Sequence, residues 1–259
     1  MNPDVVIVAA GFGFIEPGVS KLTEIIDPKT GISVIGHVIR TLPPFVGNVV
    51  LVLNGLYGRQ VIESVERDVP PGQRVLTVYQ ETERGGTADA VRSALPEVTS
   101  DEFLVLFADM PLWRTRTVEA LIRIHEAKRP TMSMATVALN EPSTPPPLRG
   151  YGRVGRAPDG MICGVFADGT DQGSRSVNPS LYIFETRFFR DHVGLIPPRR
   201  RTDGYSDEID LPHLVAVAAK KARGVAEVLV EDPREALGIN NAADLATAAA
   251  ILERRRLQT

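Results

Sequence analysis

The chain has 259 residues, of which 43% are apolar and 24% charged, a composition that excludes a wholly disordered, collagen-like or coiled-coil protein. The net charge of −3 and the single cysteine, Cys163, argue against a nucleic-acid-binding surface and exclude a disulfide framework. The longest apolar run, 5–15, is too short to span a bilayer, which takes about 20 apolar residues. Because Asp4 and no basic residue precedes that run, we expect neither a membrane segment nor a signal peptide, and a cytoplasmic location.

Short apolar runs alternate with amphipathic segments along the first half of the chain. Runs rich in Val, Leu and Ile predict buried strands at 5–9, 49–53, 75–79 and 103–107. The segments between and after them predict helices at 32–42, 56–67, 87–95 and 115–127. This alternation predicts an α/β fold whose parallel strands are joined by right-handed crossovers.

The second half is less regular and richer in loops. Prolines at 141–150, and a run of Arg199, Arg200 and Arg201 within 197–204, predict two loops. Short strands are predicted at 160–166, 181–184 and 227–230, and helices at 211–222 and 242–256. This pattern fits a single domain over residues 1–259, with a loop-rich lobe inserted at about 141–205.

The first predicted strand runs directly into Ala10, Gly11, Phe12 and Gly13. Glycines at this point let backbone N–H groups approach a phosphate or a base, although they also occur in tight turns that bind nothing. The dinucleotide-binding fingerprint needs a third glycine where this chain has Glu16, and no Gly-Lys-Ser/Thr sequence follows as in P-loop proteins. From these residues alone the turn is therefore either a tight turn without a ligand or a ligand-binding loop of another type.

Further polar residues stand where open α/β sheets bind ligands. Lys21, in the same predicted loop, is suited to phosphate oxygens, and Asp109 follows the fourth strand, where a carboxylate suits a hard cation such as Mg²⁺. Thr87 is placed to cap the third helix. Either Asn240 or Asn241 is expected to cap the last helix, which leaves the other amide oxygen free as a metal ligand.

These motifs occur with others in a recognisable order: Val8-Ala9-Ala10-Gly11-Phe12-Gly13, Gly86-Thr87-Ala88, Phe107-Ala108-Asp109-Met110-Pro111-Leu112, Tyr151-Gly152-Arg153, Asn178, Glu208 and Gly238-Ile239-Asn240-Asn241. Over nearly the whole chain, the order resembles the nucleoside-diphosphate-sugar pyrophosphorylases. The closest resemblance is to the uridylyltransferase domain of bifunctional N-acetylglucosamine-1-phosphate uridylyltransferases. It implies a GT-A-like nucleotidyltransferase fold with a mixed, mostly parallel sheet flanked by helices. The implied reaction is attack of a sugar 1-phosphate on the α-phosphorus of an NTP, with UTP favoured, giving an NDP-sugar and pyrophosphate.

The resemblance also implies roles for individual residues. The nucleotide-binding positions would be Ala10, Gly11, Gly13, Gln80, Gly86 and Thr87. Lys21 and Asp109 would act in catalysis, and Asp109 and Asn240 would hold Mg²⁺. Substrate-binding positions would be Gly152, Asn178 and Glu208. The implied partners are an NTP and a sugar phosphate, not nucleic acid or a membrane, and a homo-oligomer is left open. Since no hexapeptide repeat follows the last helix, we expect no acetyltransferase activity.

The chain departs from the family pattern at several positions. The arginine of the glycine-rich signature is absent, with Ile15 near its place, and Ser20 replaces the proline before the signature lysine. Phe166 stands where the sugar-site glutamate is expected. Three alternatives follow. The first is a sugar-1-phosphate nucleotidyltransferase in which other basic residues compensate; the run 199–201 is one source of such charge, although a charge run usually faces water. The second is a catalytically weakened homologue that binds a nucleotide or nucleotide sugar, and the third is a nucleotidyltransferase for a non-hexose phosphate.

Overall fold

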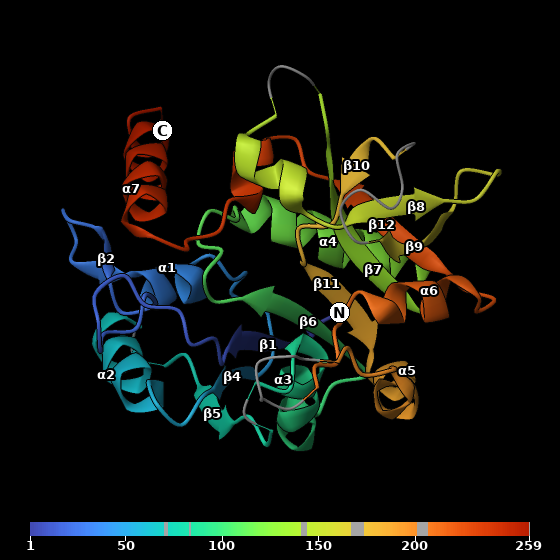
Figure 1. Ribbon diagram of the computed structural model, residues 1–259, viewed down its shortest axis with the longest axis horizontal. Coiled ribbons are helices and arrows are strands. Elements are labelled where there is room, and N and C mark those ends of the chain that lie inside the picture. Colours follow the sequence, from blue (N-terminus) through green and yellow to red (C-terminus); the bar gives the residue numbers. More distant parts are fainter. Residues whose placement is uncertain (70–71, 83, 141–143, 167–173, 201–206, 259) are drawn as a thin grey trace.

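The computed structural model describes residues 1–69, 72–82, 84–140, 144–166, 174–200 and 207–258 (Figure 1). Within these residues ten strands form a sheet in the order β5-β4-β1-β6-β11-β7-β10-β8-β9, and β12 also pairs with β7. The strands are β1 (Asp4–Ala9), β4 (Val49–Leu53), β5 (Val75–Tyr79), β6 (Glu102–Phe107), β7 (Met132–Ala138), β8 (Arg153–Arg156), β9 (Ile162–Phe166), β10 (Ser176–Val177), β11 (Tyr182–Glu185) and β12 (Val225–Leu229). A separate hairpin consists of β2 (Ile25–Asp27) and β3 (Ile32–Ser33).

The sheet is mixed and mostly parallel, as the sequence predicts. Neighbours pair in parallel from β5 through β4 and β1 to β6, and β12 is parallel to β7. Only β11, β10 and β9 of the described strands run against the others. The four strands predicted in the first half are confirmed. The apolar runs of β1, β4 and β6 are buried on both faces of the sheet, whereas β5 lies at its edge and is partly exposed.

Helices cover both faces of the sheet. They are α1 (Val34–Arg40), α2 (Gly58–Asp68), α3 (Thr87–Ala94), α4 (Thr115–Lys128), α5 (Thr186–His192), α6 (His213–Ala219) and α7 (Ala242–Arg256). Val5 and Ile7 of β1 belong to a core cluster with side chains of α1, α2, α4 and α7. Val6 belongs to a second cluster, with side chains of α3, α5 and α6. Alternate residues of one strand thus pack into two cores, as in other α/β sheets with helices on both faces.

The helix predicted at 32–42 is shorter than expected. Its first two residues form β3, and Ser33 caps the helix by accepting a hydrogen bond from Gly36 N at 3.2 Å. The helix predicted at 211–222 is likewise reduced to α6, which starts after Pro212 and is followed by a turn that ends at Gly224, where φ is 55°. Turn-forming residues therefore shorten both helices.

Four elements of the second half were not predicted: β7, β8, β10 and α5. β7 is buried, but Ser133 and Thr136 interrupt its apolar run. The Ser133 hydroxyl lies 2.9 Å from His125 Nδ1, and Thr136 donates to Glu227 Oε2 at 3.0 Å. These partners satisfy the polar side chains, so that the strand stays buried without an apolar sequence pattern.

The region predicted as a loop-rich lobe, 141–205, contributes β8, β9, β10 and β11 to the sheet in its described parts. The first predicted loop contains a 3₁₀ helix, Pro146–Gly150, instead of extended chain throughout. Residues 141–143 and 167–173, and the end of the second predicted loop from 201 onward, lie outside the described residues. In the part of the chain that the structure describes, no helix is both long and apolar enough to cross a membrane.

Candidate functional site

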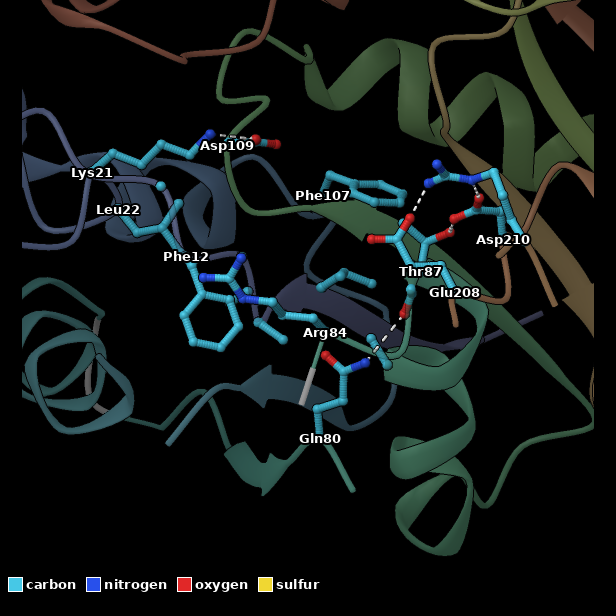
Figure 2. Close-up of a pocket in the computed structure, with 18 residues that line it drawn as sticks. Phe12, Lys21, Leu22, Gln80, Arg84, Thr87, Phe107, Asp109, Glu208 and Asp210 are labelled. Carbon is cyan, nitrogen blue, oxygen red and sulfur yellow. Dashed lines mark hydrogen bonds and ion pairs between the residues drawn. The ribbon is translucent and has the colours of Figure 1, made fainter. Parts of the chain in front are cut away.

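A cleft of about 490 Å³ opens beside the carboxyl ends of β1 and β6 (Figure 2). Loops at this edge of an open α/β sheet are the usual place for a ligand. The residues that line the cleft are Val8, Ala9, Ala10, Gly11, Phe12, Gly13, Lys21, Leu22, Gln80, Arg84, Gly86, Thr87, Ala90, Phe107, Asp109, Arg199, Glu208 and Asp210. The lining thus includes most of the site residues that the sequence predicts.

The glycine-rich loop, 10–21, is held in shape by its own backbone. Phe14 and Ser20 form an antiparallel bridge, and Lys21 N donates to Gly13 O at 3.2 Å. A Cβ atom at Gly13 would lie 2.9 Å from Lys21 Cε, so any larger residue would displace the lysine side chain. The loop therefore turns back on itself and brings Lys21 to the cleft.

Lys21 is the point at which distant segments meet. Its Nζ atom donates to Asp109 Oδ2 at 2.7 Å, to the carbonyl oxygen of Ile239 at 2.6 Å and to Asn240 Oδ1 at 3.4 Å. Lys21 is 8% exposed, so these oxygens hold a cation that is largely shielded from water. The structure therefore brings Lys21, Asp109 and Asn240 together, although 88 and 219 positions separate the lysine from the other two.

One of the two asparagines before α7 caps the helix, as the sequence predicts, and the other does not. Asn241 caps the helix by accepting from Asp244 N at 2.9 Å, and Asp244 Oδ2 accepts from Asn240 N at 2.9 Å. The side chain of Asn240 is thereby left to face Lys21. From the last turn of α7, Arg255 Nη1 donates to Leu112 O at 2.6 Å, which ties the helix to the segment after β6.

The β5–α3 loop forms a second wall of the cleft. Gly86 has a φ of 92°, and a Cβ there would lie 2.5 Å from Ile209 O, so only glycine fits. The expectation that Thr87 caps α3 is wrong, because the cap is Gly86 and Thr87 is already helical. The Thr87 hydroxyl instead accepts from Leu211 N at 3.0 Å and donates to Asp210 Oδ1 at 3.5 Å. It joins this wall to the segment around 210.

Glu208 reaches the cleft beside Arg199. The two residues pair through their backbones across the undescribed residues 201–206, and their side chains form an ion pair. Arg199 Nε also lies 3.2 Å from Asp210 Oδ2. In the arginine run 199–201, Arg199 is thus held by carboxylates, Arg200 is exposed and residue 201 lies outside the described residues.

Two predicted substrate positions, Gly152 and Asn178, adjoin each other but do not line the cleft. Asn178 N donates to Gly152 O at 2.9 Å. The Asn178 side chain donates to the hydroxyl of Tyr182 at 2.5 Å and accepts from Ser180 N at 3.1 Å. Asn178 is 5% exposed, and the nearby Phe166 is 42% exposed. The amide of Asn178 is therefore engaged within the protein.

Among the lining residues that sequence reasoning missed, Arg84 forms a pair with Phe12. The Arg84 guanidinium lies over the Phe12 ring, 4.6 Å from its centre, and joins the β5–α3 loop to the glycine-rich loop (Figure 2). The available signal was a basic residue between Gln80 and Gly86, two positions that the resemblance had already selected.

Tyr151 lies near Asp109, one of the two residues expected to hold Mg²⁺. Burial, with the nearby carboxylate of Asp109 acting in the same direction, raises the pKa of Tyr151 to about 12. Its hydroxyl donates to Ala236 O at 2.9 Å. The phenol therefore remains a neutral donor at ordinary pH and supports the segment that leads to Ile239.

Comparison with known proteins gives a consistent result. The pattern of the MobA-like NTP transferase domain matches residues 5–158. The chain is similar to the bifunctional protein GlmU of Pelobacter propionicus, with 32% identity over 181 residues, 68% of this chain and 37% of that protein. It is also similar to the bifunctional protein GlmU of Streptomyces griseus subsp. griseus, with 29% identity over 262 residues, 98% of this chain and 51% of that protein. The chain thus spans about half, or less, of the length of these curated relatives.

Solved structures share the fold at lower identity. The structure of CMP:2-keto-3-deoxy-manno-octonic acid synthetase complexed with CTP has a TM-score of 0.67 and 15% identity, covering 98% of this chain and 100% of that one. HddC from Yersinia pseudotuberculosis has a TM-score of 0.65 and 17% identity, covering 96% of this chain and 99% of that one. At these identities the likeness shows a common fold alone.

Proposed function

The chain belongs to the MobA-like NTP transferase domain family, and on that premise we propose that it joins an NTP, UTP in the first instance, to a sugar 1-phosphate. In the proposed reaction a phosphate oxygen of the sugar 1-phosphate bonds to the α-phosphorus of the NTP. The bond from that phosphorus to the β-phosphate oxygen breaks, and pyrophosphate leaves. The observation that carries the proposal is the convergence of Lys21, Asp109 and Asn240 at the glycine-rich end of one cleft.

The oxygen atoms around Lys21 fit a hard cation. The carboxylate of Asp109, the carbonyl of Ile239 and the amide oxygen of Asn240 all lie within hydrogen-bonding distance of one nitrogen. Mg²⁺ prefers such oxygen donors together with substrate phosphates. Asp109 and Asn240 would hold it, and when bound it would neutralise phosphate charge at the reacting phosphorus.

The protein's own groups would position the substrates. Backbone N–H groups of the glycine-rich loop can approach the phosphates because Gly11 and Gly13 carry no side chain. The lining cations among the described residues are Lys21, Arg84 and Arg199. We assign to Arg84, which lines the cleft and lies over the Phe12 ring of the glycine-rich loop, the phosphate contact that this loop lacks. Phosphoryl transfer depends mainly on such positioning and charge stabilisation, which favours an active enzyme over a weakened homologue.

A second candidate is a nucleotidyltransferase whose acceptor is a non-hexose phosphate. It is favoured by Asn178, whose amide is engaged by Tyr182 and Ser180 and does not reach the cleft. Phe166 in place of a sugar-binding carboxylate points in the same direction. Only the acceptor differs between the two candidates.

Pyrophosphate release tests both candidates. The four common NTPs are each combined with hexose 1-phosphates, a polyol phosphate and choline phosphate, with Mg²⁺ or with EDTA. We expect Mg²⁺-dependent release for at least one pair, and the productive acceptor decides between the candidates. Lys21→Ala should lower turnover by about 10²-fold, the size of a lost charge-stabilising donor. The control is Lys29→Ala, since the Lys29 side chain is 59% exposed and pairs with Glu253.

Two results would contradict the proposal. Tight nucleotide binding without release for any pair would favour the weakened homologue. Undiminished release by folded Lys21→Ala would show that the glycine-rich end is not where phosphates react.

A further inference from the structure

The amide of Gln80 faces the cleft in one orientation. Its Nε2 atom donates to Gly86 O at 3.2 Å and to Asp89 Oδ2 at 2.9 Å. A primary amide has two N–H bonds, so both donors are used within the protein. Figure 2 shows the nitrogen turned toward the backbone of the β5–α3 loop and the oxygen turned the other way, along the cleft. Gln80 therefore offers a ligand an acceptor and no donor.

The chemistry of its neighbours holds that orientation. A carbonyl and a carboxylate can only accept, so a flipped amide would set its oxygen against both. Asp89 is 2% exposed, and its other oxygen, Oδ1, accepts from Arg92 Nη2 at 2.5 Å. The buried carboxylate is thus held between an arginine and the amide. We call Arg92, Asp89 and Gln80 the amide relay.

Gly85 leaves room for the relay. A Cβ atom at Gly85 would lie 2.5 Å from Asp89 Oδ2, the oxygen that receives Gln80. The backbone of Gly85 is also held on both sides. Its N–H donates to Thr82 O at 3.0 Å, and its carbonyl oxygen accepts from Ile209 N at 2.8 Å. A side chain at Gly85 would therefore move the carboxylate before it moved the loop.

We infer that Asp89 is a positioning residue for base recognition, and that the amide relay selects a nucleobase whose ring nitrogen carries a hydrogen facing Gln80. This inference rests on the proposed function, in which the cleft takes an NTP. Uracil offers an N–H at ring position 3, whereas the same nitrogen of cytosine is an acceptor. Two acceptors face to face lose a hydrogen bond and repel, so cytosine is rejected.

The unmodified protein gives the first test. Calorimetry with Mg²⁺ compares UTP, CTP and the triphosphate of 3-methyluridine, which lacks the ring N–H. We expect UTP to bind at least about 10-fold more tightly than either of the others, since the loss of one hydrogen bond has roughly this effect. CTP or the methylated nucleotide binding as tightly as UTP would overturn the inference without any variant.

Two variants test the relay itself. In Asp89→Asn, Arg92 competes for the single remaining oxygen, and the new NH₂ group can face Gln80 and favour the flipped amide. We expect the preference for UTP over CTP to fall about 10-fold or more, while affinity for inorganic tripolyphosphate is unchanged. Gly85→Ala should act in the same direction by displacing the carboxylate. Loss of the UTP preference with tripolyphosphate binding retained is a result that a merely structural role would not produce.

The matched control is Asp191→Asn, which removes a carboxylate 3.9 Å from Arg187, 60% exposed and away from the cleft lining. It should leave the ratio of UTP to CTP affinity unchanged. An unchanged ratio in folded Asp89→Asn would refute the relay while leaving the proposed function intact. If no nucleotide binds the unmodified protein, the proposed function fails together with the inference.

Discussion

Arg84 comes from the β5–α3 loop and reaches Phe12 of the glycine-rich loop. The arginine of the family signature is absent from that glycine-rich loop. The Arg84 guanidinium lies 4.6 Å from the centre of the Phe12 ring, and both residues line the cleft. A hydrogen bond between a guanidinium and a phosphate joins two charged groups and is stronger than one between neutral groups. We therefore expect Arg84→Gln to lower affinity for an NTP by about 10-fold or more and affinity for the corresponding NMP by much less.

Calorimetry with the NMP, NDP and NTP of one base measures this difference. Arg59→Gln is the control, because the Arg59 side chain is 91% exposed and pairs with Glu63 on α2. Equal losses for NMP and NTP would assign Arg84 to the base or ribose, and not to the phosphates.

The predicted residues differ in how much local sequence could reveal about them. That Asn240 or Asn241 caps the last helix follows from the preference of asparagine for a helix start, and the structure assigns the cap to Asn241. The same reasoning failed at Thr87, because a glycine that must have positive φ precedes it and takes the cap position. The meeting of Lys21 with Asp109 and Asn240 depends on tertiary structure, so a resemblance could suggest it whereas periodicity could not. Arg84 lies in a loop, where no periodic pattern marks a residue that faces a ligand.

At the level of elements, the start of β1 is held by one carboxylate. Asp4 is 2% exposed and accepts from Asn48 N at 2.7 Å, Thr99 N at 2.7 Å and Ser100 N at 2.9 Å. Burial acts to raise the pKa of Asp4, but these N–H donors outweigh it and hold the pKa below the usual 3.8. We expect Asp4→Ala to lower the free energy of unfolding by about 3 kcal/mol at pH 7.

The pH dependence of that loss has a definite sign. A depressed carboxyl pKa stabilises the folded protein above the unfolded-state pKa, and the contribution disappears as pH falls through the folded-state value. The difference between wild type and Asp4→Ala should therefore shrink below about pH 4. Urea unfolding at pH 7 and near pH 3 measures it, with the exposed Asp101→Asn as control. A difference that stayed constant over this range would mean that the carboxylate charge is not what holds the strand.

Elements were predictable where burial and sequence pattern coincide. The strands β4 and β5 have the predicted ends because apolar runs stop where the strands stop. β7 could not be predicted in the same way, since Ser133 and Thr136 are buried with partners that belong to α4 and β12. A polar residue in a buried strand is recognisable only once its partner is known.

Across the whole molecule, β6 joins the parallel and antiparallel parts of the sheet. It is parallel to β1 on one side and antiparallel to β11 on the other. The only tryptophan, Trp113, is 2% exposed and follows β6, whereas the only cysteine, Cys163, lies on β9 at the far edge. Because the sheet is continuous between these two residues, we expect one cooperative unfolding transition.

The two unique residues are the probes for this expectation. Tryptophan fluorescence and the reactivity of the thiol toward a disulfide reagent, followed in increasing urea, should give the same midpoint. Earlier exposure of the Cys163 thiol than of Trp113 would show that the antiparallel part unfolds by itself.

The contact between Lys21 and Ile239, 218 positions apart, also sets an order of events during synthesis. A chain emerges from the ribosome with its amino terminus first and can fold as it emerges. The glycine-rich loop and the β5–α3 loop are therefore made long before the carbonyl of Ile239 and the amide of Asn240 that contact Lys21. A nascent chain would have to keep this lysine without its carbonyl and amide partners, and the proposed transfer could begin only after Asn240 has been translated and has docked.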